Sequence, residues 1–261
     1  MVATRRPYTP GQPKLRHYPP QKSVDAVGSG EQDARMTIGQ RTAGRFAIAS
    51  GIVTLAAAVV LLIFFAVEAP ALVESGDVDR ITVFGSANDA LIAVSLMLLL
   101  PVAAFVARVG EPRRLQPVAG FVGLAGLGMG TIFMFTTALR VIDYGTNSIL
   151  IGVAFATVGA WLLALNVPVG ATELFGRGAR WAGVLAGLGF LSTGVFAAIA
   201  GPSATADPTT LLSSPLLVAV LGLGMAGLHL ATPVWAILSG RRWVAADKRS
   251  APMAPVGQSG G

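Results

Sequence analysis

His229 is the side chain of this sequence best suited to proton or ligand chemistry inside an apolar segment. It lies thirteen residues after Leu216 in the apolar run 216–238, about 20 Å along a helix that rises 1.5 Å per residue. An ionisable group at membrane depth is a functional hypothesis by default, because burying it in lipid is costly. The alternative is a neutral histidine that hydrogen-bonds a helix carbonyl or a hydroxyl group. The other histidine, His17, lies outside the apolar runs, which excludes a bis-histidine haem within one chain.

Charged residues also border two of the apolar runs. Asp89 precedes the uncharged stretch 90–107, and Arg140 follows the uncharged stretch 118–139. Two pairings are open: Asp89 with Arg140 across antiparallel helices, or Arg140 with Asp143 at the local i, i+3 spacing. The set fits either an ion network that orients helix ends or the mouth of a path for an ion or a small polar solute.

Motifs for metal, cofactor or covalent catalysis are missing from the sequence. There is no Cys, so disulfides, Cys-ligated zinc and iron–sulfur clusters are excluded within this chain. No HExxH, Walker loop, paired intramembrane carboxylates or Ser-His-Asp arrangement is present. A rhomboid-like protease needs Gly-x-Ser-Gly in the fourth apolar run, where this chain has Gly-Val-Ala-Phe at 152–155. We therefore expect no cofactor and no enzymatic activity.

The elements that must position these residues are six apolar runs. They cover residues 46–67, 87–107, 118–139, 149–169, 182–200 and 216–238. A bilayer core of about 30 Å needs about 20 helical residues, which is roughly the length of each run. The chain is 53% hydrophobic and 12% charged, far more apolar than a soluble domain. The sequence predicts an all-α polytopic membrane protein with six transmembrane helices.

The basic residues fall almost wholly on one side of these runs. Alternating the loops puts 17 of the 19 Lys and Arg residues on one face and leaves Arg80 and Arg140 on the other. Because cytoplasmic loops are enriched in Lys and Arg, this pattern predicts a multi-pass protein of the cell membrane with both ends in the cytoplasm. The same bias explains the pI of about 10.5, so the expected partner is the lipid bilayer and not nucleic acid.

Two tails flank the predicted transmembrane domain, which covers residues 41–243. Residues 1–40 combine basic residues with five prolines and are expected to be disordered, because they cannot bury enough apolar surface. This tail either helps to set the topology or contacts anionic lipid or a cytoplasmic partner. Residues 244–261 form a second, shorter tail that is also expected to be disordered. The first run starts too far into the chain for a cleavable signal peptide, so we expect a retained signal anchor.

A weak internal repeat relates the odd-numbered runs to one another and the even-numbered runs to one another. The segment Leu124–Gly128 recurs as Leu185–Gly189, and the even runs carry Pro-Val at Pro101, Pro168 and Pro233. The repeat favours three tandem helical hairpins in parallel orientation. Each proline is expected to kink its helix.

Small residues mark the faces on which the third and fifth runs are expected to pack. Lipid gives helices no hydrophobic drive to associate, so close backbone approach through Gly takes its place. Glycines at helical spacing share one face of each of these two helices. They are Gly123, Gly126 and Gly130 in the third run and Gly183, Gly187 and Gly194 in the fifth. Such faces serve packing within one chain or self-association.

The sixth run carries small residues on two faces. One stripe contains Gly222, Ala226, His229 and Pro233, and the opposite stripe contains Gly224, Gly227 and Ala231. A helix with two close-packing faces should lie between neighbours, so we expect this helix near the centre of the bundle.

Tryptophans are divided between the middle and the ends of the predicted helices. Trp161 lies near mid-depth and is expected to fill space in the core. Trp181, Trp235 and Trp243 lie nearer the basic boundary and are expected to anchor the helices at the membrane interface.

The function most consistent with these observations is that of a non-enzymatic structural or accessory membrane subunit, which binds other membrane subunits or itself. The alternative is a small transporter or channel for an ion or small polar solute that uses His229, the proline kinks and the Asp89/Arg140 mouth. Transporters need convergent polar groups at the midplane, and the sequence supplies few of them.

Overall fold

The structure, a computed structural model of the whole chain, describes the backbone of residues 25–75, 82–109, 116–142, 144–168, 171–204 and 214–250. The chain divides into two compact units, Met1–Arg35 and Met36–Gly261. In the first unit the described residues form the beginning of a helix. All six candidate membrane spans belong to the second unit.

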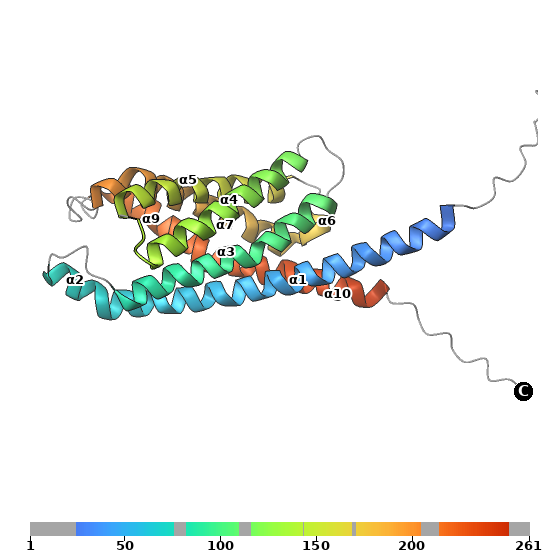
Figure 1. The fold of residues 1–261 in the computed structure, drawn as a ribbon, viewed down its shortest axis with the longest axis horizontal. Helices are drawn as coiled ribbons and strands as arrows, with labels where there is room; N and C mark the ends of the chain where they lie inside the picture. The colour runs from blue at the N-terminus through green and yellow to red at the C-terminus, as the bar shows by residue number, and fades with distance from the viewer. Residues whose placement is uncertain are drawn as a thin grey trace, which may run out of the picture. The chain divides into compact units, whose positions relative to one another are not determined.

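All the secondary structure that is described is helical (Figure 1). The elements are α1 Asp25–Ile63, η1 Phe64–Glu68, α2 Ala69–Ser75, α3 Val83–Val109, α4 Gln116–Ala138, α5 Tyr144–Asn166, α6 Ala171–Phe175, α7 Arg177–Ala204, α9 Pro215–Ala226, η2 Gly227–Ala231 and α10 Thr232–Ser250. Here η denotes a π-helical turn. Six helical segments are long and apolar enough to cross a membrane. The predicted all-α, six-span membrane protein is thus confirmed.

Part of each predicted tail is helical. α1 begins at Asp25 and α10 continues to Ser250, so both helices extend into the predicted tails. The physical reason at the N-terminal end is the position of the prolines, all of which precede residue 21 in that tail; beyond them nothing blocks helical hydrogen bonding. The remaining tail residues lie outside the described part of the chain.

Glycines bring the backbones of α5 and α7 into direct contact. A Cβ atom added at Gly159 would lie 2.7 Å from the carbonyl oxygen of Gly187, and one added at Gly152 would lie 2.7 Å from that of Gly194. Such distances leave no room for any side chain. Gly183, on the same face of α7, packs against the side chain of Asn166. The predicted glycine face of the fifth run therefore contacts α5.

The glycine face of α4 also lies against α5. Gly123 packs on the indole of Trp161, and Gly126 packs on Thr157 and Val158. Gly130 lies farther along, where an added Cβ would be 3.0 Å from Leu96 of α3. α5 is therefore held between α4 and α7 by small residues on both sides.

α1 and α10 lie side by side in antiparallel orientation (Figure 1). A Cβ added at Gly44 would lie 2.8 Å from the carbonyl oxygen of Gly240, and one added at Gly51 would lie 3.0 Å from that of Pro233. This seam closes the bundle between the first and last spans.

The two stripes predicted on the sixth span do not both pack. Gly224 and Gly227 face Thr193 and Gly189 of α7, but Gly222 is exposed and an added Cβ there would meet nothing within 4 Å. The prediction failed because it assumed one continuous α-helix. The π turn η2 inserts an extra residue per turn, so residues on either side of it no longer share one stripe. The α10 half of this span is largely buried, whereas α9 is largely exposed.

Both π turns end two residues before a proline. η1 ends at Glu68, ahead of Pro70, and η2 ends at Ala231, ahead of Pro233. A proline in a helix lacks an N–H donor and its ring clashes with the carbonyl four residues earlier. A wider turn moves that carbonyl away, which accounts for the π turns before these two prolines. Pro101 lies inside α3 without a π turn. Pro168 behaves differently and lies just beyond the end of α5.

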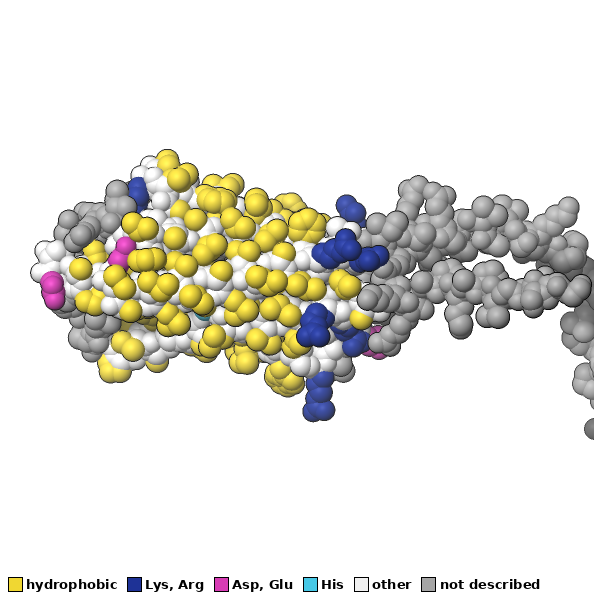
Figure 2. Space-filling model, turned by 90° about the horizontal axis from the view of Figure 1, so that it is seen from below, with side chains coloured by type: hydrophobic (Ala, Val, Ile, Leu, Met, Phe, Trp, Pro, Cys, Tyr) yellow, Lys and Arg dark blue, Asp and Glu magenta, His cyan; other side chains and the backbone are white. Residues whose placement is uncertain are grey.

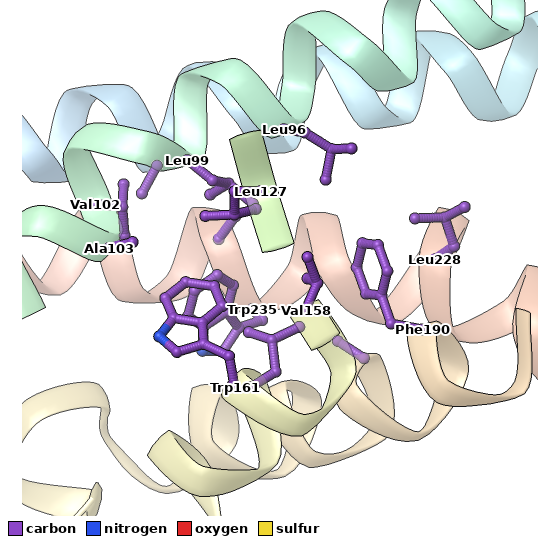
Figure 3. Close-up of a cluster of buried hydrophobic side chains, with 14 of the residues drawn as sticks. Leu96, Leu99, Val102, Ala103, Leu127, Val158, Trp161, Phe190, Leu228 and Trp235 are labelled. Atoms are coloured by element: carbon purple, nitrogen blue, oxygen red, sulfur yellow. The ribbon is translucent and has the colours of Figure 1, made fainter. Parts of the chain in front are cut away.

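Aromatic side chains fill the core where α5, α6 and α10 meet (Figure 3). Trp161 and Trp235 pack edge to face with ring centroids 6.2 Å apart, and Phe175 lies 5.9 Å from Trp235 and 5.8 Å from Trp243. Trp235 and Trp243 are 0% and 1% exposed, so they are core residues and the prediction that they anchor the interface was wrong. The short helix α6 covers them, and its Leu174 carbonyl accepts a hydrogen bond of 3.0 Å from the Trp243 indole. Trp181 is exposed, as an interfacial residue should be.

Substitution of Gly159 by Ala tests the seam between α5 and α7. The added methyl group must displace the α7 backbone, and we expect a loss of about 1–3 kcal/mol in the free energy of unfolding. The matched control is Gly222→Ala, which adds the same methyl group where nothing is within 4 Å. Since Ala favours the helix over Gly by about 0.5–1 kcal/mol, the control should be neutral or stabilising. Denaturation in mixed micelles measures both, and equal stability of the two variants would contradict the seam.

Candidate functional site

His229 lies in the π turn η2 and faces the interior of the bundle. It is 6% exposed, and neither ring nitrogen makes a hydrogen bond of normal geometry. The backbone of Met225, one turn earlier, lies beside the ring. Buried polar atoms without partners are uncommon, and single π turns occur frequently at functional sites. The structure thus gives His229 two features, a wide turn and two unused nitrogens, that the sequence did not reveal.

The π turn itself is stabilised by Thr232. Its hydroxyl donates a 2.9 Å hydrogen bond to the carbonyl oxygen of Gly227, five residues earlier, and its backbone N–H donates to the same oxygen. The wide turn therefore keeps its carbonyl satisfied at the point where Pro233 interrupts the regular pattern.

A buried cluster of hydroxyl groups joins α1 and α3. The hydroxyl oxygens of Ser50 and Ser95 are 2.9 Å apart, and those of Thr54 and Ser95 are 2.6 Å apart. Thr54 also donates to the Ser50 carbonyl at 2.9 Å. All three side chains are buried. Hydroxyl bonds of this kind hold membrane helices together, and each hydroxyl in the cluster already has a partner.

The antiparallel seam gives the depth of His229 relative to this cluster. Gly51 lies against the Pro233 carbonyl. Because the two helices are antiparallel, one turn after Gly51 and one turn before Pro233 lie at about the same depth, so His229 is level with Leu55, next to Thr54. No hydrogen bond joins His229 to Thr54, because the Thr54 hydroxyl is used within α1 and by Ser95.

The remaining hydroxyls near the midplane do not converge on His229. Thr131 and Thr157 each donate to a carbonyl of their own helix, at 2.8 and 2.7 Å. The hydroxyl of Thr193 is buried without a partner on the α7 face that packs against Gly224. The intramembrane polar groups are thus dispersed rather than gathered into one site.

At the opposite boundary from most arginines, Asp89 lies half-buried in α3. Its carboxylate is 3.5 Å from the side-chain amide of Asn88, and the charge of Arg140 acts on it through space. The two residues, both described, form no direct ion pair. Asp143, the alternative partner for Arg140, lies outside the described residues, so the choice between the two predicted pairings stays open.

Arg140 also ends helix α4. Its φ angle is +54°, its N–H donates to the Thr137 carbonyl at 3.0 Å, and the N–H of Val141 donates to the Thr136 carbonyl at 2.9 Å. These two bonds form the Schellman motif, in which a residue with left-handed backbone closes a helix. Glycine is the usual residue at this position, and an arginine there is strained.

Glu68 caps the N-terminus of α3. Its two carboxylate oxygens accept hydrogen bonds from the backbone N–H groups of Val83 and Phe84, at 2.8 and 3.0 Å. A carboxylate is stabilising there because the first N–H groups of a helix have no partner in the helix and carry positive partial charge. This role is not visible in the sequence, because Glu68 lies fifteen residues before the helix that it caps.

Two further polar side chains serve the connections between helices. Asn147, fully buried at the start of α5, donates to the Phe133 carbonyl at 3.0 Å and contacts the hydroxyl of Thr137. At the other end of α5, Arg180 donates to the carbonyls of Asn166 and Val167 at 2.8 and 2.7 Å. A cation at the C-terminus of a helix satisfies carbonyls that have no partner in the helix.

These positions limit the chemistry of the described residues. No three His, Asp or Glu side chains in the described part of the chain come together in a way that could hold a metal ion. By itself, the His229 side chain can accept or donate one proton or form a hydrogen bond to a polar ligand. Comparison of the chain with family models, curated proteins and solved structures found no match.

Replacing Arg140 by Gly separates its backbone role from its charge. Gly removes the strain of the left-handed conformation, so Arg140→Gly should be more stable than Arg140→Ala by about 1 kcal/mol. Both variants lose the guanidinium, which makes the comparison independent of charge. Unfolding of the two variants in mixed micelles measures the difference. A more stable Ala variant would contradict the helix-closing role, and a deficit of both variants relative to the native chain would report the contribution of the charge near Asp89.

Proposed function

We propose that this protein is a non-enzymatic subunit of a membrane complex that binds a transmembrane helix of another protein. The observation that carries the proposal is the exposed small-residue face of α9. Ala219, Gly222 and Ala226 are exposed at helical spacing, and an added Cβ at Gly222 meets nothing within 4 Å. Small residues on a lipid-facing surface let another helix approach closely.

Helix seams elsewhere in the same chain support this proposal. Glycines are in contact across α5 and α7 at Gly159 and Gly187, and across α1 and α10 at Gly44 and Gly240. The face of α9 around Gly222 has the same composition, but none of the described helices covers it. A partner helix with small residues would complete a contact of the same kind.

The filled interior favours an accessory role over transport. Trp161, Trp235 and Trp243 are almost completely buried where a path from the arginine-rich end would begin. The Ser50 cluster and most other intramembrane hydroxyls are bonded within the bundle. A solute path needs polar groups that face a cavity, and these groups serve helix packing instead.

We further propose that the protein lies in the cell membrane with both ends in the cytoplasm. Figure 2 shows most of the visible Lys and Arg side chains at one end of a broad apolar surface, with Asp and Glu side chains mainly toward the other end; each kind also occurs at the opposite end. The positive-inside rule assigns the arginine-rich end to the cytoplasm. The bilayer and a second membrane protein are then the partners, and no nucleic acid is expected.

Copurification in mild detergent tests the accessory role. We expect the native chain to retain a second membrane protein in fixed stoichiometry, and Gly222→Leu to lose it because the side chain blocks close approach. The matched control is Gly128→Leu on α4, where an added Cβ also meets nothing within 4 Å. The control should keep the partner. Recovery of the native chain alone or only as an oligomer of itself, or equal loss in both variants, would contradict the proposal.

A second candidate function is a small transporter or channel for protons or another small cation. The specific observation in its favour is His229, whose two nitrogens are buried in a π turn and make no hydrogen bond of normal geometry. Intramembrane histidines form proton relays in pumps and transporters. The π turn also lies next to Pro233, where a helix can change its hydrogen bonding most easily.

Proton flux into proteoliposomes tests the second function. With a pH-sensitive dye inside and a potassium diffusion potential applied, the native chain should raise the flux above that of empty liposomes. His229→Leu should lower the rate at least tenfold, while Thr193→Val, which removes another unpaired buried polar group, should leave it unchanged. A native rate equal to that of empty liposomes excludes the proton path.

A further inference from the structure

On one side of the contact between α1 and α10, two arginines lie next to apolar side chains. We refer to this surface as the arginine patch. On α1 it contains Arg45, Ile48 and Ile52, and on α10 it contains Val234, Ile237 and Arg241. In both helices the three residues have the spacing i, i+3, i+7, which places them on one face of the helix.

The glycine contact between the helices fixes the position of the two arginines. Gly44 and Gly240 are the points of contact, where a Cβ on Gly44 would lie 2.8 Å from the other backbone. Arg45 directly follows Gly44 and Arg241 directly follows Gly240. Because the helices are right-handed and antiparallel, the residue after each contact point turns to the same side of the seam. The two Cα atoms differ in depth by about 3 Å, since each helix rises 1.5 Å per residue in opposite directions.

Both arginines are exposed, and neither has an acidic partner among the side chains that the structure describes. Three of the four described acidic side chains, Glu68, Glu74 and Asp89, belong to the first span or the opposite end of the bundle. The fourth, Glu173, lies in α6, where its carbonyl accepts a hydrogen bond from Arg242. Among the described residues, neither Arg45 nor Arg241 forms an ion pair. Figure 2 shows Lys and Arg side chains gathered at this end of the apolar surface.

The apolar part of the arginine patch runs from the arginines toward the middle of the span. Ile48 and Ile237 lie at the contact between the helices: Ile48 lies 2.8 Å from a Cβ added at Gly240, and Ile237 lies 2.7 Å from one added at Gly51. Ile52 and Val234 are 57% and 48% exposed. The arginine patch therefore offers two cations at the membrane boundary and an open hydrocarbon surface directly beneath them.

We propose that the arginine patch binds an anionic phospholipid of the leaflet at the arginine-rich end. The phosphate lies between the guanidinium groups of Arg45 and Arg241, and one acyl chain lies between Ile52 and Val234. Guanidinium groups bind phosphate oxygens through paired hydrogen bonds. An apolar chain explains the exposed apolar side chains, which a free phosphate would leave uncovered. This proposal depends on insertion in a membrane and not on either proposed function.

Lipid selectivity in nanodiscs tests the proposal on the full chain. The bilayer is phosphatidylcholine with a small fraction of spin-labelled phosphatidylglycerol or, in a parallel sample, spin-labelled phosphatidylcholine. We expect the native chain to immobilise more labelled phosphatidylglycerol than labelled phosphatidylcholine. A basic residue at a membrane surface contributes about 1 kcal/mol, or about fivefold in affinity. Arg45→Gln and Arg241→Gln should each reduce the preference by about that factor, and the double variant should abolish it.

The matched control is Arg177→Gln, which removes another exposed arginine at the same end but outside the arginine patch. An equal loss in this control would overturn the proposal in favour of a diffuse basic surface. A native chain without preference for phosphatidylglycerol would also overturn it. Excess inorganic phosphate should not displace the lipid, and displacement would assign the site to free phosphate. Arg45→Lys with Arg241→Lys keeps the charge, so partial recovery of the preference separates loss of binding from misfolding.

Discussion

Close contact between backbones is the interaction on which this bundle depends. In lipid, apolar side chains gain little by leaving the solvent, so helices associate where their surfaces approach most closely. Gly152 and Gly159 leave the backbones of α5 and α7 in contact, with 2.7 Å between an added Cβ and the opposite carbonyl oxygen. Once α5 is fixed against α7, its opposite face receives α4, and Trp161 is enclosed between Gly123 and Trp235.

The second constraint is that every backbone polar group in lipid needs a partner inside the protein. Prolines lack a backbone N–H donor. In two of the spans a π turn ends two residues before the proline, at Pro70 and Pro233. The same requirement explains the long-range caps. Glu68 satisfies the first N–H groups of α3, and Arg180 satisfies the last carbonyls of α5. Arg140, which the sequence marks as a candidate for chemistry, likewise closes the end of α4.

The spans and the packing faces of α4 and α7 could be predicted because both follow from a regular helical period. Run length gave the six helices, and the spacing of Gly183, Gly187 and Gly194 gave the face that lies on α5. The phase of the sixth span could not be predicted in the same way. The extra residue in η2 rotates the side chains of the following helix about its axis. A regular helical period, counted along the sequence, does not include this rotation. Gly222 and His229, placed on one stripe by counting, are consequently exposed and buried, respectively.

The sequence identifies His229 as the candidate residue, but it does not reveal which groups surround its side chain. His229 stands out in any reading, since it is an ionisable group in an apolar run. Whether its two nitrogens find hydrogen-bond partners depends on where the neighbouring hydroxyl groups point. The hydroxyls of Ser50, Thr54 and Ser95 point at one another. Burial without a hydrogen bond costs free energy, and the Thr193 hydroxyl carries that cost as well. Such a cost is retained where the group is used or where rigid neighbours enforce it. The glycine seams on both sides of this span are such neighbours, so the geometry of His229 follows from packing alone. This is why the accessory role takes precedence over transport.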